Sequence, residues 1–307
     1  MKKISSIIWV LLWSLSYAQK EKAVYLFTSF REPATEGLYL AYSEDGYHWN
    51  DLGGGFLKPE VGSSKIMRDP SIVKGTNGMY HLVWTTDWKG GTGFGYANSK
   101  DLIHWSPQHY IPVMKNEPEV VNIWAPELFY DEPNQMYIIV WASTIPFRFE
   151  KGVEEEKNNH RLYYVTTKDF NTFSETKLFL DPGFSCIDAV IVAKAKKEYV
   201  LVFKDNTRPM RNLKVAYAKS PLGPYQNVSA PFTDFLSEGP TVMKKDSDWV
   251  IYYDYYGQKN YKAVTTSDFK HFTDISSAIQ LPVGHKHGTI TTISSAILKG
   301  LKERKKE

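Results

Sequence analysis

A short polar segment that ends in an aromatic residue occurs five times along this chain of 307 residues. Four copies carry Asp two positions after a Ser or Thr, and the fourth copy in chain order has diverged. The copies begin at Ser43, Ser99, Thr167, Lys219 and Thr266. Repeats of roughly 40–60 residues that are built from strands are typical of β-propellers. The spacing therefore predicts one ring of five similar sheets rather than several separate domains.

Strand-like runs precede each copy of this segment. Residues 79–84 and 136–141, for example, are almost continuously apolar and rich in β-branched and aromatic side chains. Such runs indicate strands that neighbouring sheets cover on both faces. The first run, residues 23–27, has no strand-like run before it, and the last, residues 287–293, has none after it. Pairing of these two runs would remove two sheet edges, so we expect an all-β, five-bladed β-propeller closed by its C-terminal strand.

The composition of the two ends suggests how the chain is divided. Residues 1–18 have the lysines, apolar stretch and small-residue end of an export signal, although a buried N-terminal helix is an alternative. We therefore expect one propeller over residues 19–299, a solvated basic tail over residues 300–307, and a periplasmic or secreted protein. A net charge of +3 does not favour nucleic acid as a partner, and the apolar stretch is short for a membrane span. We expect a monomer without an intramolecular disulfide, because Cys186 is the single cysteine.

The strands that should line the central channel begin with chemically unusual residues. In a propeller the innermost strands surround this channel. The sequence predicts a ring of residues at comparable heights, formed by Asp69, Glu127, Asp188, Glu238 and His287. Carboxyl groups that converge in this way shift one another's pKa values, and folding does not require such an arrangement. The ring is therefore the main functional signal in the chain.

Each carboxylate also has a purely structural explanation. Asp69 precedes Pro70, as in a common turn, and Asp188 would cap backbone N–H groups at the start of an apolar strand. Glu238 would lie in an exposed loop. Taken together and in register, the three carboxylates favour the hydrolysis of an acetal, in which one carboxyl donates a proton and another activates water. A third carboxylate raises the pKa of the proton donor.

Four short motifs in this order resemble glycoside hydrolase family 43, the five-bladed propeller hydrolases of arabinan- and xylan-type glycans. The motifs cover residues 68–72, 124–127, 187–189 and 237–240, and Ala189 replaces a proline that is usual in the family. The resemblance implies an inverting enzyme with Asp69 as general base, Glu238 as general acid and Asp188 as the residue that tunes and orients the acid. In an inverting enzyme the two working carboxyls are roughly 6.5–9.5 Å apart.

The positions of several aromatic and charged residues near the channel suggest which of them hold the sugar. We expect substrate to contact Arg68, Trp88, Trp124, Glu127 and Arg208, although packing in the core is an alternative for both tryptophans. Arg211 and the polar insertion over residues 147–159 are further candidates for the rim. His287 resembles a channel histidine that binds a calcium ion or its water in several family members, with a hydrogen-bonded structural histidine as the alternative. No cofactor is expected to be required, and any calcium would be structural.

Several functions remain compatible with this reading. The first expectation is exo-acting hydrolysis of α-L-arabinofuranosyl or β-D-xylosyl ends of plant- or algal-type polysaccharides and oligosaccharides. Galactan-active enzymes, a non-catalytic sugar-binding propeller and retaining five-bladed glycosidases are alternatives. A retaining sucrose- or fructan-cleaving enzyme would need a Trp/Asn-Asp-Pro-Asn-Gly segment that the chain lacks. A sialidase would have six blades, although residues 43–49 look like its Asp-box.

Overall fold

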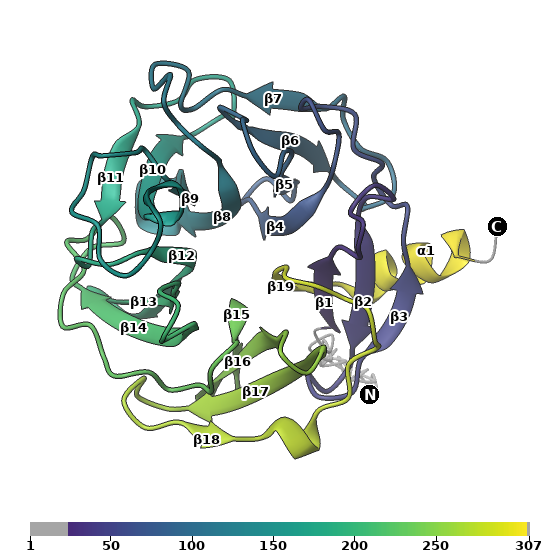
Figure 1. Cartoon of the computed structure of the whole chain (residues 1–307). Helices are drawn as coiled ribbons and strands as arrows, with labels where there is room; N and C mark the ends of the chain where they lie inside the picture. Colours follow the sequence, from purple (N-terminus) through teal and green to yellow (C-terminus); the bar gives the residue numbers. More distant parts are fainter. Residues whose placement is uncertain (1–23, 306–307) are drawn as a thin grey trace, which may run out of the picture.

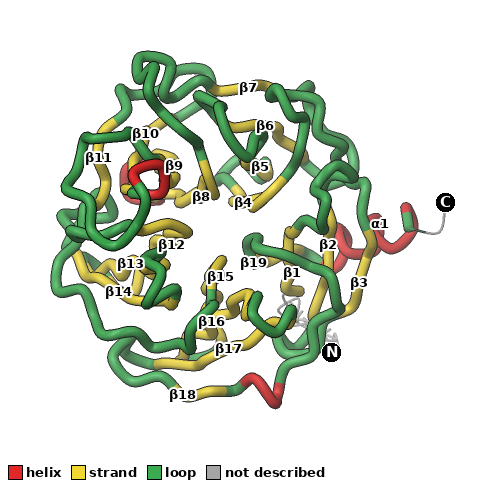
Figure 2. Tube along the Cα trace, viewed as in Figure 1, coloured by secondary structure: helices red, strands yellow, loops and turns green. Residues whose placement is uncertain are grey.

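The computed structural model describes residues 24–305 and contains five antiparallel sheets arranged as a ring (Figure 1). The expected five-bladed β-propeller is therefore confirmed. The expected export signal over residues 1–18 lies outside the described residues. Helical structure outside the C-terminal helix is limited, in the described part of the chain, to three short 3-10 segments (Figure 2). These segments are Glu132–Asn134, Glu156–Asn158 and Ser276–Ala278.

Each blade places one strand at the channel and its last strand at the rim (Figure 1). Blade 1 consists of β19 (Ile290–Ile293), β1 (Val24–Ser29), β2 (Tyr39–Ser43) and β3 (Asn50–Gly53). Blade 2 consists of β4 (Arg68–Lys74), β5 (Tyr80–Thr85), β6 (Phe94–Ser99) and β7 (His109–Ile111). Blade 3 consists of β8 (Trp124–Asp131), β9 (Met136–Ser143), β10 (Arg161–Thr167) and β11 (Lys177–Leu180). Blade 4 consists of β12 (Cys186–Ala195), β13 (Glu198–Asp205) and β14 (Asn212–Ala218). Blade 5 consists of β15 (Glu238–Lys245), β16 (Asp248–Tyr255), β17 (Asn260–Thr266) and β18 (Thr273–Asp274).

The ring closes through the pairing that the sequence predicts. Strand β19 is antiparallel to β1, with Val24 opposite Ile293 and Phe27 opposite Ile290. The C-terminal strand therefore supplies the inner strand of blade 1. This pairing satisfies the backbone groups of both strands, which would otherwise be exposed at sheet edges.

The repeated polar segment forms the turn after the third strand of a blade. In blade 2 the Asp101 carboxylate accepts hydrogen bonds from the backbone N–H groups of Ile103 and His104, at 2.9 and 2.8 Å. Burial opposes ionisation of Asp101, but the His104 side chain and these N–H groups hold its pKa below the usual range. The bonds stabilise a turn in which Leu102 has a left-handed φ of 65°. Asp45, Asp169 and Asp268 accept equivalent bonds in blades 1, 3 and 5.

The diverged fourth copy follows a different path. In blade 4 the turn contains a cis peptide bond between Gly223 and Pro224. A single bridge between Tyr217 and Gln226 takes the place of a fourth strand in the described structure of this blade. The loss of the Asp turn therefore coincides with a shorter sheet.

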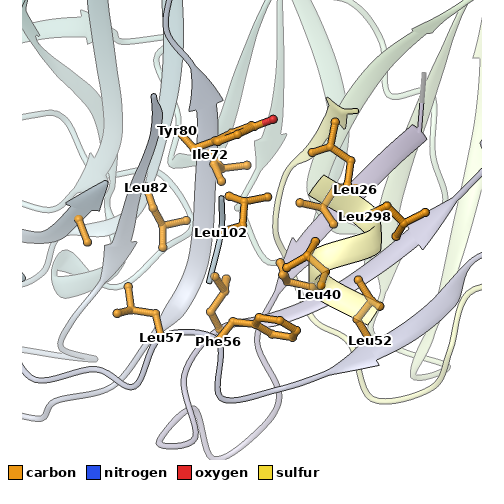
Figure 3. Close-up of a cluster of buried hydrophobic side chains, with 14 of the residues drawn as sticks. Leu26, Leu40, Leu52, Phe56, Leu57, Ile72, Tyr80, Leu82, Leu102 and Leu298 are labelled. Atoms are coloured by element: carbon orange, nitrogen blue, oxygen red, sulfur yellow. The ribbon is translucent and has the colours of Figure 1, made fainter. Parts of the chain in front are cut away.

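The core consists of apolar clusters that fill the spaces between adjacent blades. One cluster joins blades 1 and 2 and includes Leu26, Leu40 and Leu82, which are all fully buried (Figure 3). Both faces of the inner strands are covered in this way, which explains their continuous apolar runs. No helix in the described part of the chain is long and apolar enough to cross a membrane.

The C-terminal residues differ from the expected solvated tail. Helix α1 (Ser295–Arg304) is capped by Ser294, whose side chain accepts a hydrogen bond from the backbone N–H of Ile297. Its Leu298 (Figure 3) and Leu301 are buried and belong to the cluster between blades 1 and 2. Residues 300–304 were predicted as part of a tail because their basic side chains dominate the composition. The two leucines, spaced three residues apart, instead fix this segment to the propeller.

Replacement of Leu301 by Ala should destabilise the propeller, because this side chain of α1 is completely buried. Removal of a buried leucine costs about 2–4 kcal/mol. Urea unfolding followed by tryptophan fluorescence measures the loss, with the exposed Lys299→Ala as the control. Equal stability of the two variants would show that the helix is not anchored.

Candidate active site

One end of the channel opens into a pocket of about 250 Å³. The pocket brings together most of the residues that the sequence predicts. Its lining includes Arg68, Asp69, Trp88, Trp124, Asp188, Glu238 and His287. Glu127 and Arg208 are not among the residues that line it.

A shared irregularity of the inner strands points these side chains into the pocket. The pairing register shifts between Arg68 and Ser71 in β4, and equivalent shifts occur in β8, β12 and β15. The residue inside each shift has a left-handed φ, namely Asp69, Ala125, Asp188 and Gly239. Such φ values are costly for residues other than Gly and are frequent at functional sites. The bulges turn the strand ends toward the channel.

Because of these bulges, the residues that the sequence predicted as an equivalent ring do not all occupy equivalent positions. Asp69 and Asp188 occupy the same position in their blades, and Ala125 and Gly239 are their counterparts. Glu238 is one residue earlier in its strand than that position, and Glu127 is two residues later. The five predicted residues are therefore not all at the same height. A bulge inserts extra residues between paired positions, so counting from the start of a strand misplaced Glu127.

Asp69 and Asp188 share the His287 imidazole. His287 Nδ1 is 3.3 Å from Asp69 Oδ1 and 3.9 Å from Asp188 Oδ1. Burial disfavours the imidazolium, but the charge of Asp188 and the hydrogen bond and charge of Asp69 raise the pKa of His287 to about 9. The imidazole is therefore protonated at neutral pH and compensates part of the buried negative charge.

The two aspartates have different electrostatic environments. Burial opposes ionisation of Asp69, but the hydrogen bond and charge of His287 and the nearby Arg68 and Thr85 hold its pKa below the usual value. Thr85 Oγ1 donates a hydrogen bond to Asp69 Oδ2 at 2.9 Å. Burial raises the pKa of Asp188, although His287 and Lys204 act in the opposite direction. Asp69 is therefore the stronger candidate for a carboxylate that remains ionised.

The backbone of Gly239 connects Asp188 to Glu238. Gly239 N donates a hydrogen bond to Asp188 Oδ2 at 3.0 Å. Because Gly239 directly follows Glu238, this bond fixes the main chain beside the glutamate. A Cβ atom at Gly239 would lie 2.6 Å from the His287 ring, so glycine is required here for close approach as well as for its φ.

Lys204 is a site residue that the sequence reasoning missed. Its Nζ is 2.7 Å from Glu238 Oε2, and only 2% of its side chain is exposed. Burial opposes its charge, but Glu238 and Asp188 outweigh this effect and raise the pKa of Lys204. The sequence does contain a sign of this role, because Lys204 lies near the end of the apolar strand β13, where an unpaired charge would be unfavourable.

Glu127 lies deeper in the channel. Its Oε2 accepts a hydrogen bond from Thr289 Oγ1 at 3.1 Å. Burial raises its pKa to about 7, although the hydroxyl of Ser71 and the charge of His287 act in the opposite direction. Glu127 is not among the residues that line the pocket, and its predicted contact with substrate stays a prediction.

Aromatic side chains form one wall of the pocket. Trp88 stacks on Trp124 with ring centroids 4.6 Å apart, and Trp124 stacks in turn on His160. The Arg68 guanidinium lies over the Trp88 ring at 4.8 Å and also pairs with Glu32 at 2.7 Å. Trp88 is 49% exposed, so part of its ring remains accessible to a ligand. Trp88 is therefore not a core residue, which was the alternative explanation for the two tryptophans.

Arg208, which the sequence predicted to contact substrate, does not line the pocket, whereas the nearby Arg211 does. Arg208 pairs with Glu155 outside the pocket, at 2.5 Å. Its backbone N–H also donates to Glu154 Oε1 at 2.5 Å, so the loop over residues 147–159 is tied to the turn after β13. Arg211 lines the pocket, and its guanidinium has no ion-pair partner among residues 24–305. The sequence alone did not distinguish these two arginines.

The described side chains give no direct support for a metal ion. In residues 24–305 no group of three or more His, Cys, Asp and Glu side chains is arranged to hold one. The calcium expected from the resemblance at His287 therefore stays a prediction.

A five-bladed propeller with several carboxylates around one pocket is the architecture of a class of glycoside hydrolases. The family described as "probable glycosyl hydrolase domain", which is related to glycosyl hydrolase family 43, matches residues 21–298. The chain belongs to this family. The resemblance inferred from the four motifs is thereby confirmed.

Two proteins similar to this chain are α-L-arabinofuranosidases. An α-L-arabinofuranosidase of Bifidobacterium longum subsp. longum is 22% identical over 147 residues, which cover 41% of this chain. The aligned part spans only 14% of the length of that relative. The crystal structure of an α-L-arabinofuranosidase from Lactobacillus brevis has a TM-score of 0.54 at 18% identity, covering 68% of this chain and 72% of its own.

Two further structures share the fold. A family 62 α-L-arabinofuranosidase from Coprinopsis cinerea has a TM-score of 0.55 at 14% identity, covering 75% of each chain. A xylan β-1,4-xylosidase from Bacillus halodurans has a TM-score of 0.52 at 19% identity, covering 69% of this chain and 42% of its own. At these identities the likeness supports the fold alone.

Replacement of His287 by Gln should destabilise the protein by about 3 kcal/mol at pH 7, because two buried carboxylates lose a shared cation. The raised pKa means that this stabilisation is complete below the unfolded value near 6.5 and is lost as pH rises through about 9. Urea unfolding at pH 6, 7 and 10 should therefore show a difference between wild type and variant that shrinks at pH 10. A constant difference would contradict a protonated His287.

Proposed function

We propose that this protein is an inverting glycoside hydrolase that removes terminal sugars from polysaccharides or oligosaccharides. The observation that carries the proposal is the placement of Asp69, Asp188 and Glu238 around one small pocket. Their partners differ, since Asp69 contacts His287, Asp188 binds Gly239 N, and Glu238 contacts Lys204. Distinct environments allow similar groups to act as base and acid.

In the proposed reaction Asp69 acts as the general base. Its carboxylate takes a proton from a water molecule, and the water oxygen forms a bond to the anomeric carbon of the bound sugar. The bond between that carbon and the glycosidic oxygen breaks at the same time, and Glu238 gives its proton to the departing oxygen. Asp188 positions Glu238 through the backbone of Gly239 and does not exchange a proton.

The Lys204–Glu238 pair gives this mechanism a specific requirement. The Lys204 ammonium is 2.7 Å from the Glu238 carboxylate and forms an ion pair with it. A proton donor must be uncharged before the reaction. We infer that a bound glycoside excludes water and moves Lys204 and Glu238 apart, so that Glu238 faces the glycosidic oxygen with its proton.

Pocket size and the family relationship suggest the substrate. A volume of about 250 Å³ is below the roughly 300–1,000 Å³ of sites for drug-sized ligands, and it suits one sugar ring at a chain end. The exposed part of the Trp88 ring offers an apolar contact, and Arg68, Arg211 and Asn206 offer hydrogen-bond donors. Similar proteins named arabinofuranosidases and xylosidases favour α-L-arabinofuranosyl or β-D-xylosyl ends. We propose further that the protein acts as a monomer after export, on polysaccharide outside the cytoplasm.

Substitution of the two working carboxylates tests these roles. Asp69→Asn and Glu238→Gln should each lower kcat on a natural disaccharide by about 10²–10⁴-fold, because each removes one proton transfer. A panel of p-nitrophenyl glycosides identifies the sugar. Arg208→Met, outside the pocket, is the matched control and should retain wild-type activity. Equal rates for all three variants would refute the assignment, as would NMR detection of a first product with retained configuration.

Lys204→Met tests whether Lys204 acts on the proton donor. Loss of the 2.7 Å contact leaves Glu238 Oε2 without this partner, so kcat on the natural disaccharide should fall about tenfold or more while KM changes little. Lys204→Arg keeps a cation beside the carboxylate and should restore most of the wild-type kcat. A fall in kcat that Lys204→Arg does not restore would indicate a merely structural lysine.

A further inference from the structure

Glu238 borders a second cavity in addition to the pocket described above. This cavity measures about 1050 Å³ and lies between blades 5 and 1. Its walls come from the end of β16, the start of β17, residues 276–286 and the turn after β1. Residues 276–286 belong to the segment that crosses from the rim strand β18 to the channel strand β19 (Figure 1).

The two cavities meet at two places. Glu238 lines both of them. The ion pair between Arg68 and Glu32 forms the second contact, because Arg68 lines the smaller pocket and Glu32 lines the larger cavity. A ligand that extends beyond the small pocket past Glu238 would therefore enter the larger cavity.

We propose that the larger cavity is the leaving-group site, in which the part of the glycan that departs from the terminal sugar is bound. This inference rests on the proposed hydrolytic function. A general acid lies beside the glycosidic oxygen, between the sugar that is released and the group that leaves. With one sugar in the 250 Å³ pocket on one side of Glu238, the leaving chain occupies the 1050 Å³ cavity on its other side.

The lining of this cavity has unused hydrogen-bonding groups. Among residues 24–305, the buried hydroxyls of Tyr256 and Tyr261 have no hydrogen-bond partner. Buried polar atoms are normally satisfied, so these two hydroxyls indicate a bound polar ligand or water. The hydroxyls of a sugar chain can both donate to and accept from a tyrosine.

Both tyrosines are also close to the catalytic groups. Lys204 Nζ lies over the Tyr256 ring, 5.0 Å from its centroid, and Lys204 pairs with Glu238. Burial raises the pKa of Tyr261 well above its usual value, and the charges of Asp254, Glu238 and Asp69 add to the effect. Asp254 is opposite Glu238 in the β15–β16 pairing and binds Lys286 at 2.9 Å. Through Lys204, Tyr256 is therefore close to the acid, and we expect the first leaving sugar to lie against this wall of the cavity.

The length of the leaving chain provides the test. For wild type, kcat/KM on oligosaccharides of two to five sugars, from the series that the enzyme cleaves, should rise with length as the cavity fills. The glycosyl fluoride of the released sugar has no leaving sugar and serves as the reference substrate. Tyr261→Phe and Tyr256→Phe should each lower kcat/KM on the tetrasaccharide about three- to tenfold and leave the value for the fluoride unchanged.

Tyr163→Phe is the matched control. Tyr163 is also buried without a hydrogen-bond partner for its hydroxyl in the described chain, but it lines a separate cavity of about 750 Å³ beside blade 3. This variant should leave both substrates unaffected. All three substitutions remove only an unpaired hydroxyl, so the thermal midpoint should not fall.

The possible results separate this inference from the proposed function. Equal losses on the tetrasaccharide and the fluoride would show that the tyrosines act on Glu238 rather than on the leaving chain, and would overturn the inference. Rates that do not depend on chain length would overturn it as well. Absence of hydrolysis of any glycoside or fluoride by wild type would instead refute the proposed function.

Discussion

The active site depends on the bulge at the channel end of the inner strands. A regular strand would point successive side chains to opposite faces of its sheet, toward the neighbouring blades. The left-handed residues Asp69 and Asp188 interrupt this alternation at equivalent places, so their carboxylates reach the pocket. The conformation is unfavourable for a residue with a Cβ atom. It persists because His287, Thr85 and Gly239 N bind the two carboxylates in place.

The sequence predicted the fold well because the fold is repetitive. The Asp-containing turns recur at blade spacing, and each Asp binds backbone N–H groups within three residues, so the signal is local. Ring closure followed from a counting argument, since one strand was missing at each end. The helix α1 was not predicted, because its stability comes from Leu298 and Leu301 packing on blades 1 and 2, and a short basic segment alone gives no sign of that surface.

The site was predicted less completely. The motifs gave Asp69, Asp188 and Glu238, but the height of Glu127 depends on a bulge that cannot be counted from the sequence. Arg208 and Arg211 are three residues apart in one turn, and only the contacts of Glu154 and Glu155 show which one is held away from the pocket. Lys204 was missed because its partner Glu238 is distant in sequence and belongs to another blade.

Charge balance connects these features. Three carboxylates in one small pocket would repel one another strongly if all were ionised without compensation. His287 and Lys204 supply two nearby cations, each in contact with the carboxylates, so most of the negative charge is balanced before substrate binds. The two cations contact different carboxylates, since His287 contacts Asp69 and Asp188, and Lys204 contacts Glu238. His287 supports the ionised base, whereas Lys204 must release Glu238 for acid catalysis. A glycan that fills both cavities beside Glu238 would supply the interactions that replace this ion pair, so binding of the leaving chain and readiness of the acid would be coupled.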